Sequence, residues 1–238
     1  MLAAMKSQAS IVGLRRVGFL IDLSDARLEA LAKQFNWRRV SEGDAVVTRA
    51  ARDRDVYLIV GGKVRVAAAS AAGRQVTYHD LGPGSLIGEL AALDGGARSA
   101  DVLALEDTLV AAMPPALFNQ ILDESRTANR WMMQRLSASV RELTERVFDL
   151  TTLGVQNRVH AELLRLAREA GVADNRASIN PAPRHVDVAT RISTNREQVA
   201  REMSELAKRG LVERAGRVLL LRDVAALEYL VAEVRSHD

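Results

Sequence analysis

The spacing of apolar residues predicts a short helix near the N-terminus, followed by a change of pattern. The apolar positions at helical intervals are Leu28, Leu31, Ala32 and Phe35. Ser24 precedes them as a helix N-cap, and Leu23 and Leu28 are placed as a hydrophobic staple. Residues 1–18 show no clear pattern, so we expect a loose arm there.

From Trp37 to about Pro114 the pattern is that of short strands. Runs rich in β-branched and other apolar residues are separated by turns that contain Gly or Pro. The runs cover residues 45–48, 56–60, 63–66, 75–78 and 109–112. Many short strands at this spacing predict an antiparallel sandwich or barrel, and eight of them would form a double-sheet jelly roll.

After Pro114-Pro115 a helical period returns, and one stretch has the heptad spacing of a coiled coil. Its apolar residues are Met133, Leu136, Val140, Leu143, Val147 and Leu150, which we call the seam. Beside a complete sandwich such a seam would leave apolar surface exposed in a monomer, so we predict a symmetric homodimer. The alternative is that the seam packs against its own sandwich. Gly154, just after it, is a candidate hinge.

The C-terminal residues predict a winged helix-turn-helix. A helix over 155–170 ends at Gly171, and a polar, Pro-containing loop follows over 173–183. The next elements are a short helix over 186–192, a tight turn at 193–195, a second helix over 196–208 and two strands over 211–221. A final helix near Leu227 to Val234 could pack on this domain or on a partner.

The helix over 196–208 carries candidate DNA-reading side chains. Val199, Met203 and Leu206 share one face and should point to the core. Arg196, Glu197 and Arg201 lie on another face near its N-terminal end. Arginine can bond bidentately to guanine O6 and N7, and glutamate can accept from cytosine N4.

Two residues before this helix, Thr194 and Asn195, are placed for phosphate contacts, which set the register of a protein on DNA. Glu197 has an alternative role, because Thr194-x-x-Glu197 also fits a capping box. Asn195 and Gln198 could cap the helix instead.

Composition narrows the possible functions. The 33 basic and 30 acidic residues give a net charge of only +3, so any nucleic-acid surface must be local. Between Arg184 and Arg217 the sequence contains eight basic and five acidic residues. The absence of cysteine excludes a disulfide framework, a thiol redox sensor and a cysteine-ligated iron–sulfur cluster, and it is compatible with a cytoplasmic location.

Several other classes of function lack their signatures. No apolar run is long enough for a secretory signal or a membrane span, so we expect no membrane partner. The four histidines have no ligand-like spacing, so we predict no metal site. No Ser/His/Asp set or Walker loop is visible, and we do not expect an enzyme or catalytic residues.

The stretch from Ile87 to Ala100 holds the residues with the most distinctive chemistry. Gly88, Glu89, Leu90 and Ala91 are followed by Arg98 and Ser99. Arg98 would offer a planar fork to two phosphate oxygens, and the amides after Gly88 would favour an anion. Glu89 could accept a hydrogen bond from a ribose hydroxyl. The alternative is a Gly-rich surface turn whose Glu and Arg have no role.

This cassette, within a strand-rich segment and ahead of a long helix and a winged helix-turn-helix, resembles the Crp/Fnr family of bacterial regulators. The resemblance covers about residues 19–222, with Ile87 and Ala97 in place of a common Phe and Pro. It implies an α+β chain with an N-terminal arm and three further parts. These are a cyclic-nucleotide-binding jelly roll over 19–123, a dimerisation helix over 124–153 and a winged helix-turn-helix DNA-binding domain over 154–238.

The resemblance also implies a function. A cyclic nucleotide, cAMP first and cGMP second, would act as an allosteric ligand and not as a prosthetic group. Its contacts would be Gly88, Glu89, Leu90, Ala91, Arg98 and Ser99, with Leu143 and Thr144 of the long helix at the positions of base contacts.

Arg196, Glu197 and Arg201 resemble the family's base-reading set, which implies palindromic double-stranded DNA with TGTGA-like half-sites. RNA polymerase is a further partner that the family allows. The alternative is a DNA-binding regulator of the same type that needs no cyclic nucleotide or answers another small ligand.

Overall fold

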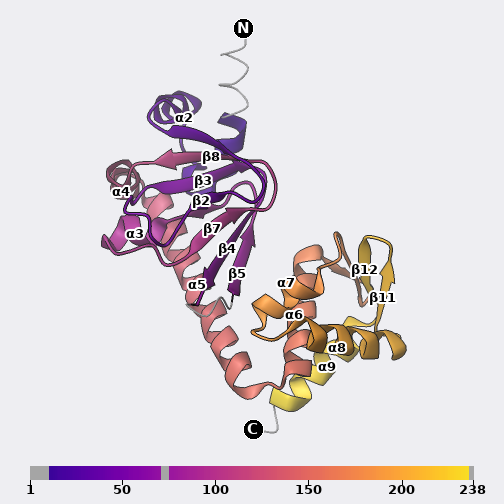
Figure 1. Cartoon of the computed structure of the whole chain (residues 1–238). Helices are drawn as coiled ribbons and strands as arrows, with labels where there is room; N and C mark the ends of the chain where they lie inside the picture. Colours follow the sequence, from indigo (N-terminus) through magenta and orange to yellow (C-terminus); the bar gives the residue numbers. More distant parts are fainter. Residues whose placement is uncertain (1–10, 71–74, 236–238) are drawn as a thin grey trace. The chain divides into compact units, whose positions relative to one another are not determined.

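The computed structural model describes residues 11–70 and 75–235, and the chain forms two compact units. The units are Met1–Ser139 and Val140–Asp238. Their boundary falls inside the long helix α5 (Arg126–Thr152), which is labelled in Figure 1.

Eight strands within the described residues of the N-terminal unit form two four-stranded antiparallel sheets. The strands are β1 (Asn36–Val40), β2 (Ala45–Val47), β3 (Val56–Gly61), β4 (Val64–Ala69), β5 (Gln75–Leu81), β6 (Leu86–Ile87), β7 (Asp101–Ala104) and β8 (Thr108–Met113). One sheet has the order β1-β8-β3-β6 and the other β2-β7-β4-β5. The predicted antiparallel sandwich is confirmed, and each of the five expected runs overlaps a strand.

The sheet that contains β3 is buried on both faces. Successive residues of a strand point to opposite sides. Tyr57 and Ile59 lie in a core to which both sheets contribute, whereas Val56 and Leu58 lie in a second core with the helices. This double burial makes β3 an almost continuous apolar run, which is why no alternation marks it in the sequence.

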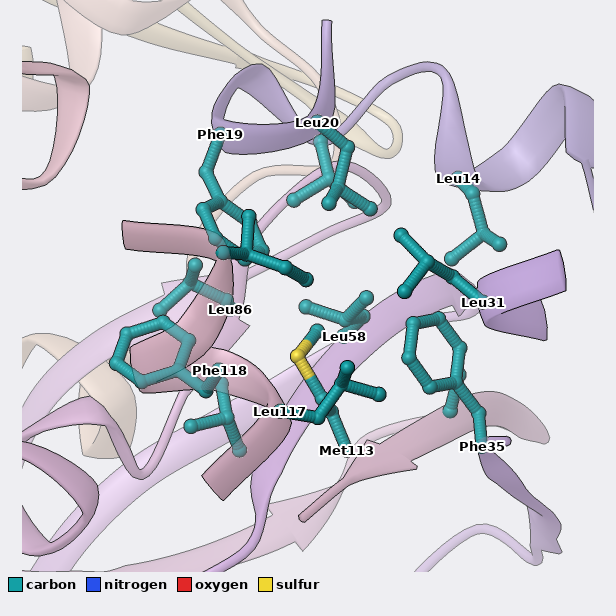
Figure 2. Packing of buried hydrophobic residues seen from close by; sticks show 14 of the residues in the cluster. Leu14, Phe19, Leu20, Leu31, Phe35, Leu58, Leu86, Met113, Leu117 and Phe118 are labelled. Atoms are coloured by element: carbon teal, nitrogen blue, oxygen red, sulfur yellow. The ribbon is translucent and has the colours of Figure 1, made fainter. Parts of the chain in front are cut away.

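The second core joins the sheet to α2 (Asp25–Ala32), α4 (Pro115–Glu124) and the start of α5. Leu58 and Met113 of the sheet lie among Leu31, Leu117 and other helix side chains in Figure 2. The predicted cap of α2 is confirmed, because Ser24 Oγ accepts a hydrogen bond from the Arg27 amide at 3.3 Å. A cap of this kind contributes roughly 1 kcal/mol to helix stability.

The expectation of a loose arm over 1–18 is wrong for the part of it that the structure describes. Residues 11–14 are helical, and the side chain of Leu14 is fully buried in the second core (Figure 2). The side chain of Val17 is also fully buried there. The short helix η1 (Gly18–Leu20) adds Phe19 and Leu20 to this core. The segment is too short to show a period, so only tertiary packing reveals it. Residues 1–10 lie outside the described residues.

The C-terminal unit holds the predicted winged helix-turn-helix. Its elements are α6 (Val155–Ala170), β9 (Val172–Ala173), β10 (Arg176–Ile179), α7 (His185–Arg191), α8 (Arg196–Lys208), β11 (Val212–Ala215), β12 (Val218–Leu221) and α9 (Val224–Arg235). The expected helices over 155–170, 186–192 and 196–208 correspond to α6, α7 and α8.

One part of this unit differs from the prediction, because the expected loop over 173–183 contains a strand. β10 pairs with β9 and with β12, which gives a four-stranded sheet in the order β11-β12-β10-β9. Only Ala177 and Ile179 of β10 are buried, and polar residues alternate with them. A four-residue strand with two buried positions is too short to stand out from a polar loop.

The final helix packs on its own unit. Leu227 of α9 is fully buried and Leu230 is partly buried, both in the core that α6 and α8 share. Over residues 11–70 and 75–235, none of the helices combines the length and the apolar composition needed to span a membrane.

Candidate ligand site and nucleic-acid interface

The cassette forms where β6 passes through Gly88 into the short helix α3 (Glu89–Asp94). Gly88 has a φ of +86°, a conformation that side-chain-bearing residues rarely adopt. A Cβ atom at this position would lie 2.4 Å from Arg98 Nη1 and 2.8 Å from the Asp55 carbonyl oxygen. Glycine is therefore required both by the backbone angle and by the approach of the arginine.

Arg98 is the centre of this site and is almost completely buried, with 5% of its surface exposed. Its Nη1 donates to the Gly88 carbonyl at 3.3 Å, and its Nη2 donates to the Asp55 carbonyl at 2.9 Å. The guanidinium also lies 5.5 Å from the centre of the Tyr57 ring, within the range of a cation–π contact. Its Nε is buried without a partner among the described residues.

Asp53, which the sequence did not single out, neutralises Arg98. Its Oδ1 accepts from Arg98 Nη2 at 2.5 Å and from the Tyr57 hydroxyl at 3.0 Å. Burial alone would raise the pKa of Asp53, but these two hydrogen bonds and the Arg98 charge bring the pKa below its ordinary value. Burial, followed by the bond to Asp53, raises the pKa of Tyr57. The carboxylate is thus ionised and held in place.

Sequence reasoning could not find Asp53, because 45 residues separate it from Arg98. It lies in the loop before β3, where its neighbours are mostly exposed. The residues of this loop, Ala50, Ala51, Arg52 and Asp53, show no pattern that would mark one of them as part of a ligand site. A local pattern does not reveal which distant side chain an acidic residue meets.

The other cassette residues lie together around α3. Ala91 is buried, Glu89 and Gly88 are partly buried, and Leu90 and Ser99 are exposed. Glu89 and Ser99 are therefore accessible to a ligand. Leu143 and Thr144 belong to the other unit, where Leu143 is exposed and Thr144 Oγ1 donates to the Val140 carbonyl at 2.9 Å. Their contact with a bound base stays a prediction.

Most of the seam on α5 is exposed in the single chain. Leu136 packs partly against the second core, and Leu150 is also partly buried. The exposed members are Met133 at 61%, Val140 at 63%, Leu143 at 45% and Val147 at 60%. A row of exposed apolar side chains along a helix is typical of a surface that a partner covers.

In the C-terminal unit, α7, a tight turn and α8 form the helix-turn-helix. Ser193 in the turn has a φ of +55°, and the Thr194 amide donates to the Ala189 carbonyl at 3.0 Å. Asn195 caps α8, because its Oδ1 accepts from the Gln198 amide at 2.9 Å. Thr194 Oγ1 is hydrogen-bonded to Gln198 Oε1.

The capping role considered for Glu197 is taken by Asn195, so Glu197 remains exposed at the start of α8. Arg196 and Arg201 are exposed as well. Val199 and Leu206 are fully buried, as their spacing predicted. The candidate base-reading residues thus lie on the open side of a helix that the core holds from the other side.

A buried polar pair that the sequence did not reveal helps to fix α8. His160 Nε2 of α6 and Glu202 Oε1 of α8 lie 2.7 Å apart, and both side chains are buried. Since a buried polar group is costly unless it is paired, this contact specifies how α8 packs on α6. Within residues 11–70 and 75–235, no three His, Cys, Asp or Glu side chains gather as a metal site.

The surface around the start of α8 is locally positive. His185, at the start of α7, has a lowered pKa, first because of partial burial and then because of the charges of Arg214 and Arg196. Arg214 comes from β11 and Arg196 from α8. The two arginines therefore lie close enough to His185 to disfavour its protonation, and their charges suit a phosphate backbone.

Each of the two units contains a segment that matches a known protein family. Residues 37–125 match the family model described as a cyclic nucleotide-binding domain, and residues 157–230 match a Crp-like helix-turn-helix domain. The chain is 28% identical over 208 residues to the cyclic AMP receptor protein of Thermus thermophilus, covering 87% of this chain and 93% of that protein.

One further protein is similar in sequence, and another is similar in fold. A CRP-like cAMP-activated global transcriptional regulator of Mycobacterium tuberculosis is 24% identical over 212 residues, which are 88% of this chain and 94% of that protein. A CooA variant from Carboxydothermus hydrogenoformans has a similar fold, with a TM-score of 0.75 at 22% identity over 85% of this chain and 90% of that one.

The fold and the two matched domains define a transcriptional regulator that joins a cyclic-nucleotide-binding domain to a Crp-like DNA-binding domain. The chain belongs to the Crp/Fnr family. The family predicted from the cassette and the helix-turn-helix is thus confirmed.

Proposed function

We propose that this chain is a homodimeric transcription regulator that a cyclic nucleotide controls, with cAMP as the first candidate and cGMP as the second. Arg98 would bind the phosphate, Ser99 would donate to it, and Glu89 would accept from the ribose. Leu143 and Thr144 would contact the base. The family consists of transcription regulators, and we assign the chain no catalytic role.

The unpartnered Nε of Arg98 carries this proposal. A buried donor without a partner costs free energy and calls for an explanation, such as a ligand that completes its hydrogen bonds. The site lies within the segment that matches the cyclic nucleotide-binding domain, next to the backbone of Gly88. A cyclic phosphate is small, carries one negative charge and offers two exocyclic oxygens to a guanidinium.

Two further features support the DNA half of the proposal. The exposed Arg196, Glu197 and Arg201 can read guanine and cytosine edges in the major groove, and Asn195 and Thr194 lie where phosphates would pass. Dimerisation through the exposed seam would pair two reading helices, so we propose a palindromic site with TGTGA-like half-sites. RNA polymerase is a further proposed partner, and the proposed location is the cytoplasm, where a bacterial chromosome lies.

The test is a titration of the full-length protein with cAMP and with cGMP by isothermal calorimetry, followed by DNA binding with and without each nucleotide. We expect micromolar or tighter binding of one nucleotide and at least about a tenfold gain in affinity for a palindromic site, since allosteric couplings commonly reach this size. No heat with either nucleotide would contradict the proposal.

A specific observation also favours a second candidate. Asp53 already supplies Arg98 with an anion, so the chain could be a DNA-binding regulator that needs no cyclic nucleotide or answers another small ligand. This candidate predicts that the purified protein, free of nucleotide, binds its DNA site at full affinity. The DNA titration without ligand therefore separates the two.

A further inference from the structure

The side chain of Asp53 is hydrogen-bonded to a part of the Arg98 guanidinium that a phosphate would bind. Nε and Nη2 form one edge of a guanidinium, and such an edge can bind two oxygens of one anion. At Arg98 the Nη2 of this edge is bonded to Asp53 Oδ1, whereas Nε has no partner among the described residues. The edge is therefore half filled by an internal carboxylate.

Asp53 is the solvent-accessible member of this pair. The side chain of Asp53 is 41% exposed, and that of Arg98 is only 3% exposed. A ligand in solvent can therefore reach the carboxylate, whereas the guanidinium is covered. A cyclic phosphate and an ionised Asp53 would repel each other at such short range, so both cannot bind Nη2 at low cost.

The contacts around Asp53 keep this arrangement in place. The Tyr57 hydroxyl donates to the same Oδ1, and the Tyr57 ring lies under the guanidinium. The neighbouring Asp55 bonds to Arg98 only through its backbone carbonyl. The Asp55 carboxylate has a raised pKa, first because of burial and then because of the Asp53 charge. Asp53 is thus the one of the two carboxylates that touches the guanidinium.

We propose that Asp53 is an internal competitor for the phosphate site, which a cyclic nucleotide must displace from Arg98 before it can bind. Asp53 then sets the ligand concentration at which the regulator responds. The inference rests on the proposed nucleotide-binding function and adds the residue that regulates the site.

Asp53→Asn tests the inference, because it keeps the shape of the side chain and its acceptor oxygen but removes the charge. We expect this variant to bind the nucleotide at least about tenfold more tightly than the wild type, which corresponds to about 1.4 kcal/mol. Asp55→Asn is the matched control, since it removes an adjacent charge that does not touch Arg98. Its affinity should stay within about threefold of the wild type, as expected for a charge without direct contact.

A second variant tests the same inference by weakening the contacts that hold Asp53 against Arg98. Tyr57→Phe removes one of the hydrogen bonds that hold the Asp53 carboxylate, so it should also tighten nucleotide binding, by a few-fold. It decides the question if Asp53→Asn does not fold, which thermal unfolding of each variant would show. Unchanged or weaker binding by Tyr57→Phe would then overturn the inference.

The measurement is calorimetric titration of the full-length wild type and variants with cAMP and cGMP. A wild type that binds and an Asp53→Asn protein of equal affinity would overturn the inference and leave the proposed function intact. Weaker binding by Asp53→Asn would overturn it too, because Asp53 would then contact the nucleotide. Binding by Asp53→Asn alone would show that Asp53 blocks the site completely, which supports the competition but contradicts nucleotide control of the wild-type protein. Binding by neither protein would contradict the proposed function and the inference together.

Discussion

The chain uses arginine in two opposite ways. Arg98 in the N-terminal unit is buried and already paired with Asp53. Arg196 and Arg201 on α8 are exposed, and neither has an acidic partner among the residues that the structure describes. The candidate ligand site is therefore neutralised by an internal carboxylate, whereas the candidate DNA-reading residues are exposed. The proposed ligand would then change how two reading helices are arranged, not whether they are exposed.

The largest effect is expected when the buried arginine is removed. Arg98→Leu should lower the affinity for cyclic nucleotide by more than about a hundredfold, because charge-assisted hydrogen bonds to the phosphate are lost. The sandwich should remain folded, since Asp53 is partly exposed and can be solvated. Calorimetry measures the affinity and thermal unfolding checks the fold. A folded variant that binds nucleotide normally would show that the cassette is not the binding site.

The second prediction concerns how the two reading helices come together. Val147→Asp places a charge in the exposed seam, and burying an unpaired charge in a dimer interface costs several kcal/mol. We expect the protein to become monomeric at micromolar concentration, as measured by light scattering after gel filtration. Specific DNA affinity should fall with it.

The control for this prediction is Ser137→Asp. Ser137 is exposed on the same helix but does not belong to the seam. This variant should stay dimeric. If both variants remain dimers, the seam is not the dimer interface.

The two groups of arginines differ in how well the sequence predicts their surroundings. The periodicity of Val199 and Leu206 located the exposed arginines of α8 correctly, because a helix repeats over a few residues. The pairing of Arg98 with Asp53 was missed, because it joins residues far apart in the chain. The buried Leu14 and Val17 were missed for a related reason, since their packing depends on helices and strands that follow much later.

The third prediction concerns the exposed arginines. Arg196→Ala should weaken binding to the specific site by about 1–3 kcal/mol and relax the preference for guanine at one position. Arg209→Ala is the control, because Arg209 is exposed at the opposite end of α8. Fluorescence anisotropy with the palindromic site, with single-base variants of it and with unrelated DNA measures both effects. An equal loss on all sequences would identify Arg196 as a phosphate contact.

The smallest expected effect concerns the pKa of His185, which tests whether the face of Arg196 is as positive as the geometry indicates. Partial burial and the charges of Arg214 and Arg196 lower the pKa of His185 below 6.5 in the folded protein. As the pH falls through about 6.5, His185 is therefore protonated in the unfolded chain before it is protonated in the folded protein. The folded state loses stability relative to the unfolded state over this range. The loss is complete once the pH is below the folded-state pKa.

His185→Gln removes this proton uptake, so the variant should lose less stability than the wild type between about pH 7.5 and pH 5.5. Thermal unfolding across this range, with the two proteins compared at each pH, isolates the contribution of His185. Bound DNA should reduce the difference, because phosphates near Arg196 and Arg214 would counter the positive charges and favour protonated His185. A difference that DNA leaves unchanged would show that the phosphates do not lie near His185. Arg196 would then be an exposed arginine that does not contact DNA.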